Sequence, residues 1–105
     1  MLARIWRGRV PAEMNEAYLR YLQATGIEEY QATEGNQGVY LLRRTEGGIT
    51  EFLILTLWDS MDAIRRFAGP EPEKPVYYPE DKDFLLEFES KVDHYEVEAY
   101  PGHGS

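Results

Sequence analysis

The only histidine inside the predicted folded part of the sequence is His94, whose imidazole could act as a general base. A neutral imidazole near physiological pH can take the proton of a phenol. If residues 92–100 form a strand, His94 shares one face with Val92, Glu96 and Glu98. No second ligand accompanies it, so the sequence predicts no metal. A structural or interface hydrogen bond is the alternative that these residues favour.

Amide and phenol side chains are further candidates for binding a ligand. Asn36 lies between Gly35 and Gly38, just before a predicted strand, and its amide could hold a ligand. A turn that favours asparagine for its tolerance of left-handed backbone is the preferred interpretation. Tyr77 and Tyr78 belong to a proline-rich loop, where their rings either line a binding site or anchor the loop.

The first predicted helix and strand carry other aromatic candidates. Tyr18 and Tyr21 lie on the inner stripe of the helix, where core packing is the stronger interpretation, and Tyr18 and Trp6 remain candidates for substrate binding. Several arginines on neighbouring strands could gather around a substrate carboxylate. Pairing across strands with Glu51, Glu96 or Glu98 explains them without a ligand and is preferred. These arginines are Arg4, Arg7, Arg9, Arg43 and Arg44.

Length and charge exclude several classes of protein. The 105 residues suffice for one domain, and the net charge is -8. From Phe67 onward there are 3 basic and 10 acidic residues. This negative charge repels nucleic acids and anionic membranes, so neither is expected as a partner. The absence of cysteine excludes disulfides and thiolate chemistry. No charged-then-apolar leader begins the sequence and no apolar run approaches about 20 residues, so we expect a cytoplasmic protein.

Hydrophobic periodicity and turn residues predict the order βαββαβ. Pro11 suits the first turn of the first helix, Gly26 should end that helix, and Asp59-Ser60 should cap the second. Four prolines make residues 69–80 an irregular loop. The expected strands are residues 2–10, 39–42, 52–58 and 92–100; the expected helices are residues 11–26, 61–68 and 81–88; and residues 101–105 are expected to be a flexible tail.

This order is the ferredoxin-like pattern of the α+β class, with one sheet and helices on one face. Residues 39–42 and 52–58 are apolar on both faces instead of alternating. Because helices can cover only one of these faces, something else must cover the other. A second copy of the chain is the simplest candidate, so we expect a homodimer.

Two segments carry a resemblance to a known family. They are residues 35–44 (GNQGVYLLRR) and the junction 58–63 (WDSMDA), in which a tryptophan closes a strand and a serine opens a helix. Residues 1–100 resemble one domain of the antibiotic biosynthesis monooxygenase family, which belongs to the dimeric α+β barrel superfamily. The resemblance implies a homodimer with a pocket between sheet and helices in each protomer. Some members oxidise polycyclic phenols with molecular oxygen and no metal or flavin, so no cofactor is expected.

The resemblance also implies roles for particular residues. Trp58 matches the tryptophan that lines the pocket, where its indole N–H could stabilise an oxyanion, and core packing is the alternative. The resulting hypothesis is a cofactor-independent monooxygenase of a small aromatic substrate, with Trp58, His94 and Asn36 as catalytic candidates. The alternatives are a non-catalytic protein that binds a small molecule such as haem, or a structural homodimer. The haem-degrading branch has an asparagine where this chain has Trp6, and a histidine after the tryptophan that this chain lacks.

Overall fold

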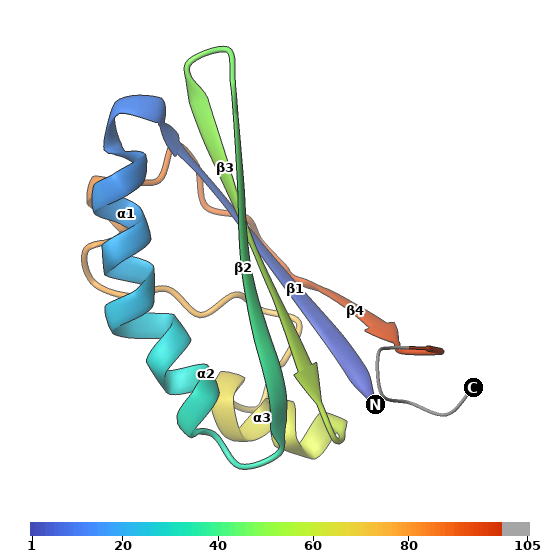
Figure 1. Cartoon of the computed structure of the whole chain (residues 1–105). Coiled ribbons are helices and arrows are strands. Elements are labelled where there is room, and N and C mark those ends of the chain that lie inside the picture. Colours follow the sequence, from blue (N-terminus) through green and yellow to red (C-terminus); the bar gives the residue numbers. More distant parts are fainter. Residues whose placement is uncertain (100–105) are drawn as a thin grey trace.

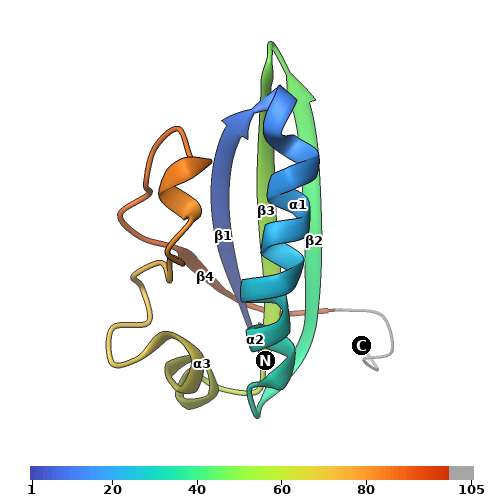
Figure 2. The same ribbon diagram turned by 90° about the vertical axis from the view of Figure 1, so that its left-hand side faces the viewer.

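A computed structural model describes residues 1–99. Its sheet contains β1 (Leu2–Pro11), β2 (Asn36–Glu46), β3 (Ile49–Trp58) and β4 (Asp93–Glu96), in the antiparallel order β2-β3-β1-β4. The helices lie on one face of this sheet (Figures 1 and 2). The prediction of an α+β, ferredoxin-like fold is confirmed. None of the helices among residues 1–99 is both long and apolar enough to cross a membrane.

The first helix extends beyond the predicted end. The helix α1 (Asn15–Leu22) continues through a π-helical turn, Gln23–Ile27, into α2 (Glu28–Ala32). The prediction that Gly26 ends the helix is therefore wrong. Gly26 is buried instead, and a Cβ atom there would stand 3.6 Å from the ring of Tyr78 and 3.7 Å from the ring of Tyr30. These are ordinary contact distances, and Gly26 is not among the glycines with a positive φ angle, so nothing at this position ends the helix.

The hairpin and the second predicted helix are confirmed. Gly47 and Gly48 connect β2 to β3 with φ angles of 59° and 78°, as a tight hairpin turn requires. The helix α3 (Met61–Ala68) begins where the Ser60 hydroxyl oxygen accepts a hydrogen bond from the Ala63 N–H at 3.2 Å. It ends at Gly69, whose φ of 86° few other residues adopt.

Residues 69–92 form a long connection that we call the strap. It covers the β1 side of the sheet, on the same face as the helices (Figure 2). The predicted helix over residues 81–88 is wrong, because only a 3₁₀ turn, Asp81–Asp83, is present. Beyond this turn the strap follows β1, and the Leu86 N–H donates to the Arg9 carbonyl at 2.9 Å. β4 is shorter than predicted, and the predicted flexible tail lies outside the described residues.

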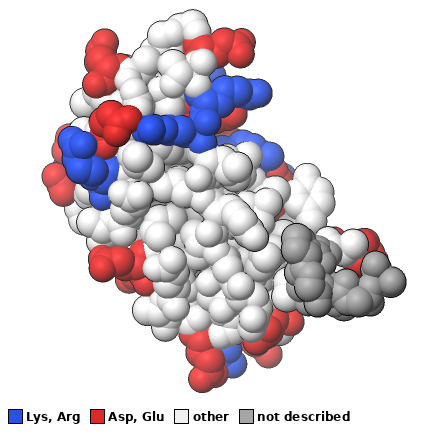
Figure 3. Space-filling view, viewed as in Figure 1, with Lys and Arg blue, Asp and Glu red and all other residues white. Residues whose placement is uncertain are grey.

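The two faces of the sheet differ in what covers them. The face toward the helices and the strap carries the buried core, to which β3 contributes every second residue from Thr50 to Trp58. On the open face, Tyr40 pairs with Leu55 and Leu42 with Leu53 across β2 and β3. Figure 3, seen from the β2 edge, shows a broad surface without charged side chains, with charged groups gathered above and below it.

Candidate functional site

A buried arginine lies at the centre of the face covered by the strap. Arg4 of β1 is 1% exposed, and among residues 1–99 it is the only fully buried basic side chain. Its guanidinium donates to the Lys74 carbonyl at 3.0 Å, to the Pro72 carbonyl at 3.5 Å and to the Tyr30 hydroxyl at 3.4 Å. Burial lowers the pKa of Arg4, and Tyr30 partly opposes this effect. No carboxylate among the described residues forms an ion pair with it.

His94 lies directly beside Arg4, because the two residues pair across β1 and β4. Its Nε2 atom is buried, and no protein atom among residues 1–99 forms a hydrogen bond with it. Burial and then the nearby Arg4 charge lower the pKa of His94, while Glu73 and Asp93 act in the opposite direction. The imidazole is therefore held neutral at pH 7, which is the form that a general base requires.

Trp6 lies two residues further along β1 on the same face and is 3% exposed. Its indole extends over Gly8, where a Cβ atom would stand 2.5 Å from the indole Cη2, and the Leu85 side chain packs there as well. The Tyr77 ring meets the indole edge-on, with ring centroids 6.3 Å apart. The buried Nε1–H of Trp6 has no acceptor among residues 1–99. A buried donor without an acceptor costs about 1–3 kcal/mol.

Trp58 is fully buried at the end of β3, and its indole N–H is already engaged. It donates to the Thr56 hydroxyl at 2.8 Å, and that hydroxyl in turn donates to the Arg4 carbonyl at 3.2 Å. The rings of Tyr30 and Phe67 pack against the indole, with centroids 6.3 and 6.1 Å away. In this arrangement the indole N–H stabilises the sheet, and Thr56 must release it before it can reach a ligand.

Asn36 of β2 and Tyr18 of α1 lie away from each other and have different partners. Asn36 pairs with Trp58 at a bulge, and its amide donates to the carbonyls of Gly38 at 3.4 Å and Leu57 at 3.3 Å. Tyr18 is fully buried on α1, and its hydroxyl donates to Asp81 at 2.8 Å. Burial raises the pKa of Tyr18, and Asp81 adds to this effect. Tyr18 therefore holds the middle of the strap.

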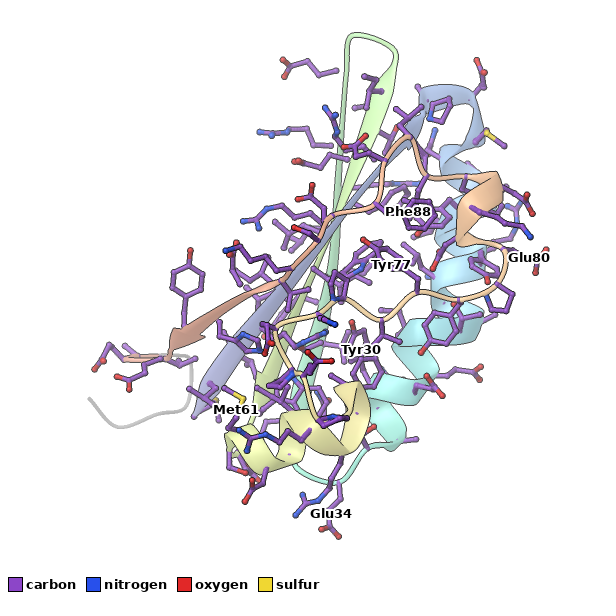
Figure 4. All side chains as sticks on the ribbon, turned by 180° about the vertical axis from the view of Figure 1, so that it is seen from behind. Tyr30, Glu34, Met61, Tyr77, Glu80 and Phe88 are labelled. Atoms are coloured by element: carbon purple, nitrogen blue, oxygen red, sulfur yellow. The ribbon has the colours of Figure 1, made fainter. Side chains whose placement is uncertain are left out.

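Tyr77 and Tyr78 also belong to the strap, but they point to different neighbours. The Tyr77 hydroxyl donates to the Glu89 carbonyl at 2.9 Å, and the Phe88 ring packs on it with centroids 4.7 Å apart. Figure 4 shows Tyr77 and Phe88 together on the strap. The Tyr78 hydroxyl donates to the Glu29 carboxylate of α2. The structure thus brings Trp6, Tyr77 and His94 to the face around Arg4, while Tyr78 and Tyr18 bind the strap to the first helix.

The five arginines have different environments. Cross-strand pairing is found for Arg44 with Glu51, at 3.1 Å, and for Arg7 with Asp93, at 2.7 Å. The others pair elsewhere, Arg9 with Glu87 of the strap and Arg43 with Glu16 of α1, and only Arg4 is buried. Its position could have been inferred from alternation along β1, because it shares its face with the apolar Trp6 and Val10. Sequence reasoning also missed Tyr30, Thr56 and Asp81.

The layer between sheet and helices is filled. Trp6, Tyr18 and Trp58 are at most 3% exposed and occupy the space where the resemblance implied a pocket. The hollows found on the described residues open on the surface instead. One of about 280 Å³ lies at the edge of the open face and is lined by Leu42, Arg43, Arg44, Glu51 and Leu53. No three metal-ligating side chains gather among residues 1–99.

Comparison with family models finds no match, and comparison with curated proteins finds none either. Several solved structures are similar, and they include the following three. A proposed antibiotic biosynthesis monooxygenase from Bacillus cereus is 18% identical, with a TM-score of 0.63 over 97% of each chain. Rv0793 from Mycobacterium tuberculosis is 19% identical, with a TM-score of 0.64 over 96% of this chain and 98% of its own.

The third structure is a mutant of MhuD with two manganese protoporphyrin IX bound per active site. It is 20% identical, with a TM-score of 0.62 over 98% of this chain and all of its own. At these identities the similarity shows the fold. The predicted resemblance to antibiotic biosynthesis monooxygenase-like proteins is confirmed at that level.

Proposed function

We propose that the chain is a cofactor-independent monooxygenase that binds a small aromatic substrate under the strap. The observation that carries the proposal is a pair of buried nitrogen atoms, Trp6 Nε1 and His94 Nε2, which have no hydrogen-bond partner among residues 1–99 and lie on the face covered by the strap. Aromatic rings from β1, α2 and the strap surround this face and offer flat surfaces to a ring system. The fold shared with a proposed monooxygenase is consistent with the same conclusion.

The chemistry needs a substrate whose carbanion reduces oxygen directly. For a methylene between two aromatic rings, the balance is R₂CH₂ + O₂ → R₂C=O + H₂O, so one oxygen atom enters the product and the other leaves as water. His94 accepts the methylene proton, because its lowered pKa keeps the imidazole neutral. Trp58 donates its N–H to the developing oxyanion after Thr56 releases it. Asn36 takes no part in this step, because it lies on β2, at the opposite edge of the sheet from His94 on β4.

Substrate entry requires the strap to move. Residues 69–80 contain four prolines and no helix or strand, so displacing them breaks no regular secondary structure. The closed strap buries the reacting groups, and closing a site in this way keeps water away from a reactive carbanion. Movement of the strap would therefore make room for a small molecule, although the layer between sheet and helices is filled when the strap is closed.

Oxygen consumption with a panel of anthrones and hydroquinones tests the proposal. For the anthrones we expect one O₂ to be consumed per methylene oxidised. Trp58→Phe should lower kcat about 10²-fold, the cost of one lost oxyanion donor. Phe67→Leu is the matched control, because it changes packing against the same indole and removes no hydrogen-bond donor. Full turnover by Trp58→Phe would remove Trp58 from the mechanism, and no oxygen uptake with any substrate would contradict the monooxygenase itself.

We also propose that a second copy of the chain covers the open face. Tyr40 and Tyr95 are 55% and 56% exposed there, and Leu42 is 49% exposed. Half-buried Leu53, Leu55 and Leu57 of β3 lie between them. Exposed apolar patches of this kind mark interaction sites, and a two-fold axis lets the same patch cover itself.

A structural homodimer without enzymatic activity is the second candidate, and the filled layer between sheet and helices favours it. Ligand titrations separate the two functions, because a bound aromatic ligand raises the melting temperature and a filled core gives no such shift. Haem binding would be a non-catalytic use of the same site. His94 is the only histidine among residues 1–99, and its buried Nε2 would reach a ligand only after the strap has moved.

A further inference from the structure

We propose that Arg4 recognises the carboxylate of the substrate, so that the site under the strap takes a flat aromatic carboxylate. This inference rests on the proposed function, since it names the substrate class of the same site. It begins from the contrast among the arginines of the sheet. Arg7, Arg9, Arg43 and Arg44 each pair with a carboxylate at the surface, whereas Arg4 is 1% exposed and pairs with none among residues 1–99.

The hydrogen bonds of Arg4 are too few and too long for a buried cation. A guanidinium carries five N–H donors. Arg4 uses three of them, and only the bond to the Lys74 carbonyl, at 3.0 Å, has an ordinary length, since those to Pro72 and Tyr30 are 3.5 and 3.4 Å. All of its acceptors are neutral. A buried charge normally has an opposite charge beside it, so this guanidinium lacks its natural partner.

The indole N–H of the neighbouring Trp6 also lacks an acceptor among the described residues. Trp6 lies on the same face as Arg4 and about 7 Å further along the strand. Its buried N–H has no acceptor among residues 1–99. Arginine and tryptophan side chains can only donate, so a ligand that satisfies both must bring acceptors. A carboxylate binds a guanidinium through two parallel hydrogen bonds, and it is the acceptor group that this geometry fits best.

The strap carbonyls occupy the place of this carboxylate. Pro72 and Lys74 belong to the segment that must move for substrate entry, and their carbonyls are the acceptors that Arg4 loses when the segment moves. The incoming carboxylate then replaces two neutral acceptors by a charged one. The aromatic body of the ligand lies against Trp6 and Tyr77, which meet edge-on beside Arg4. Arg4 thus exchanges the carbonyl acceptors of the strap for the carboxylate of the substrate.

Calorimetric titration of the full chain with 2-naphthoate and with 2-naphthamide tests this inference. The two probes share a ring system and differ in charge. We expect the wild type to bind naphthoate at least about tenfold more tightly than naphthamide. A hydrogen bond to a charged group contributes more binding free energy than one to a neutral group, and the difference corresponds to about this factor in affinity. Arg4→Met should abolish the preference. Arg7→Met should keep it, because Arg7 lies on the same strand but faces the opposite side.

The possible results separate the two proposals. Equal affinity for both probes in the wild type would overturn the role of Arg4 and leave the small-molecule site intact. Absence of binding by either probe would remove both proposals. If Arg4→Met does not fold, Arg4→Lys keeps the charge and loses the forked geometry, so its naphthoate affinity should fall several-fold. An unchanged naphthoate affinity in Arg4→Lys, or an equal loss in Arg7→Met, would contradict the inference.

Discussion

Arg4 and Asp81 are the two fully buried charged side chains among residues 1–99, and they form no ion pair with each other. Each holds a different part of the strap. Arg4 binds the carbonyls of Pro72 and Lys74, and Asp81 accepts the Tyr18 hydroxyl at 2.8 Å. The first contact involves neutral acceptors at 3.0 and 3.5 Å, whereas the second joins a donor to a carboxylate. The strap is therefore fixed firmly at Asp81 and held more weakly over Arg4.

Removal of the Asp81 carboxylate should loosen the middle of the strap. Asp81→Ala leaves the Tyr18 hydroxyl and the Tyr78 N–H without their acceptor. We expect the free energy of unfolding, measured by urea denaturation, to fall by about 1–3 kcal/mol. Asp83→Ala is the control, because Asp83 is an exposed residue of the same 3₁₀ turn. An equal loss in both variants would show that the turn, and not the buried acceptor, sets the stability.

A side chain at position 8 should displace the indole of Trp6. In Gly8→Ala, the new Cβ would stand 2.5 Å from the indole and 2.9 Å from Leu85, so one of them must shift. Overpacking of this kind costs about 1–3 kcal/mol. Gly26→Ala is the matched control, because its Cβ would meet rings at ordinary contact distances of 3.6 and 3.7 Å. Unfolding monitored by tryptophan fluorescence should show a lower free energy of unfolding for Gly8→Ala alone. Equal stability of both variants would contradict the packing described for Trp6.

His94 should make stability depend on pH. Its pKa is lowered in the folded state, so between that value and the unfolded pKa of about 6.5 the unfolded chain binds more protons. The stability contribution of neutral His94 is therefore complete above about pH 6.5 and is lost as the pH falls through the folded pKa. Urea midpoints measured between pH 7.5 and about 5 should fall more steeply for the wild type than for His94→Gln. Parallel curves would show that His94 is not the responsible group.

A charge on the open face should separate the proposed dimer. Tyr40→Glu places a carboxylate in the apolar patch, on its β2 side and opposite Leu55. Burying it against a second copy costs several kcal/mol unless it finds a partner. We expect sedimentation equilibrium to show a dimer for the wild type and a monomer for Tyr40→Glu at micromolar concentration. Lys82→Glu, an exposed change on the strap, should remain dimeric. A monomeric wild type would contradict the dimer directly.

The order and type of most elements could be predicted because their signals are local. The apolar runs, the Gly47-Gly48 turn and the Ser60 cap depend on residues a few positions apart, and they predicted the hairpin and the helix after it correctly. The helix end at Gly26 was mispredicted, because Gly26 does not adopt the positive φ angle of a C-terminal glycine and a π-helical turn continues through it. The helix over residues 81–88 was mispredicted for a similar reason, because Asp81 turns inward to Tyr18.

The sequence alone determined the α+β order, the two apolar faces of β3 and the set of aromatic side chains, since periodicity records which face each residue occupies. Only the tertiary structure decided which polar groups are buried and with whom. Alternation places Arg4 on the other face of β1 from Arg7 and Arg9, but only the tertiary structure shows that Pro72 and Lys74 of the strap cross it. Burial is set by what covers a residue, and here the covering segment lies about 70 residues away, as the separations of 68 and 70 between Arg4 and its strap partners show.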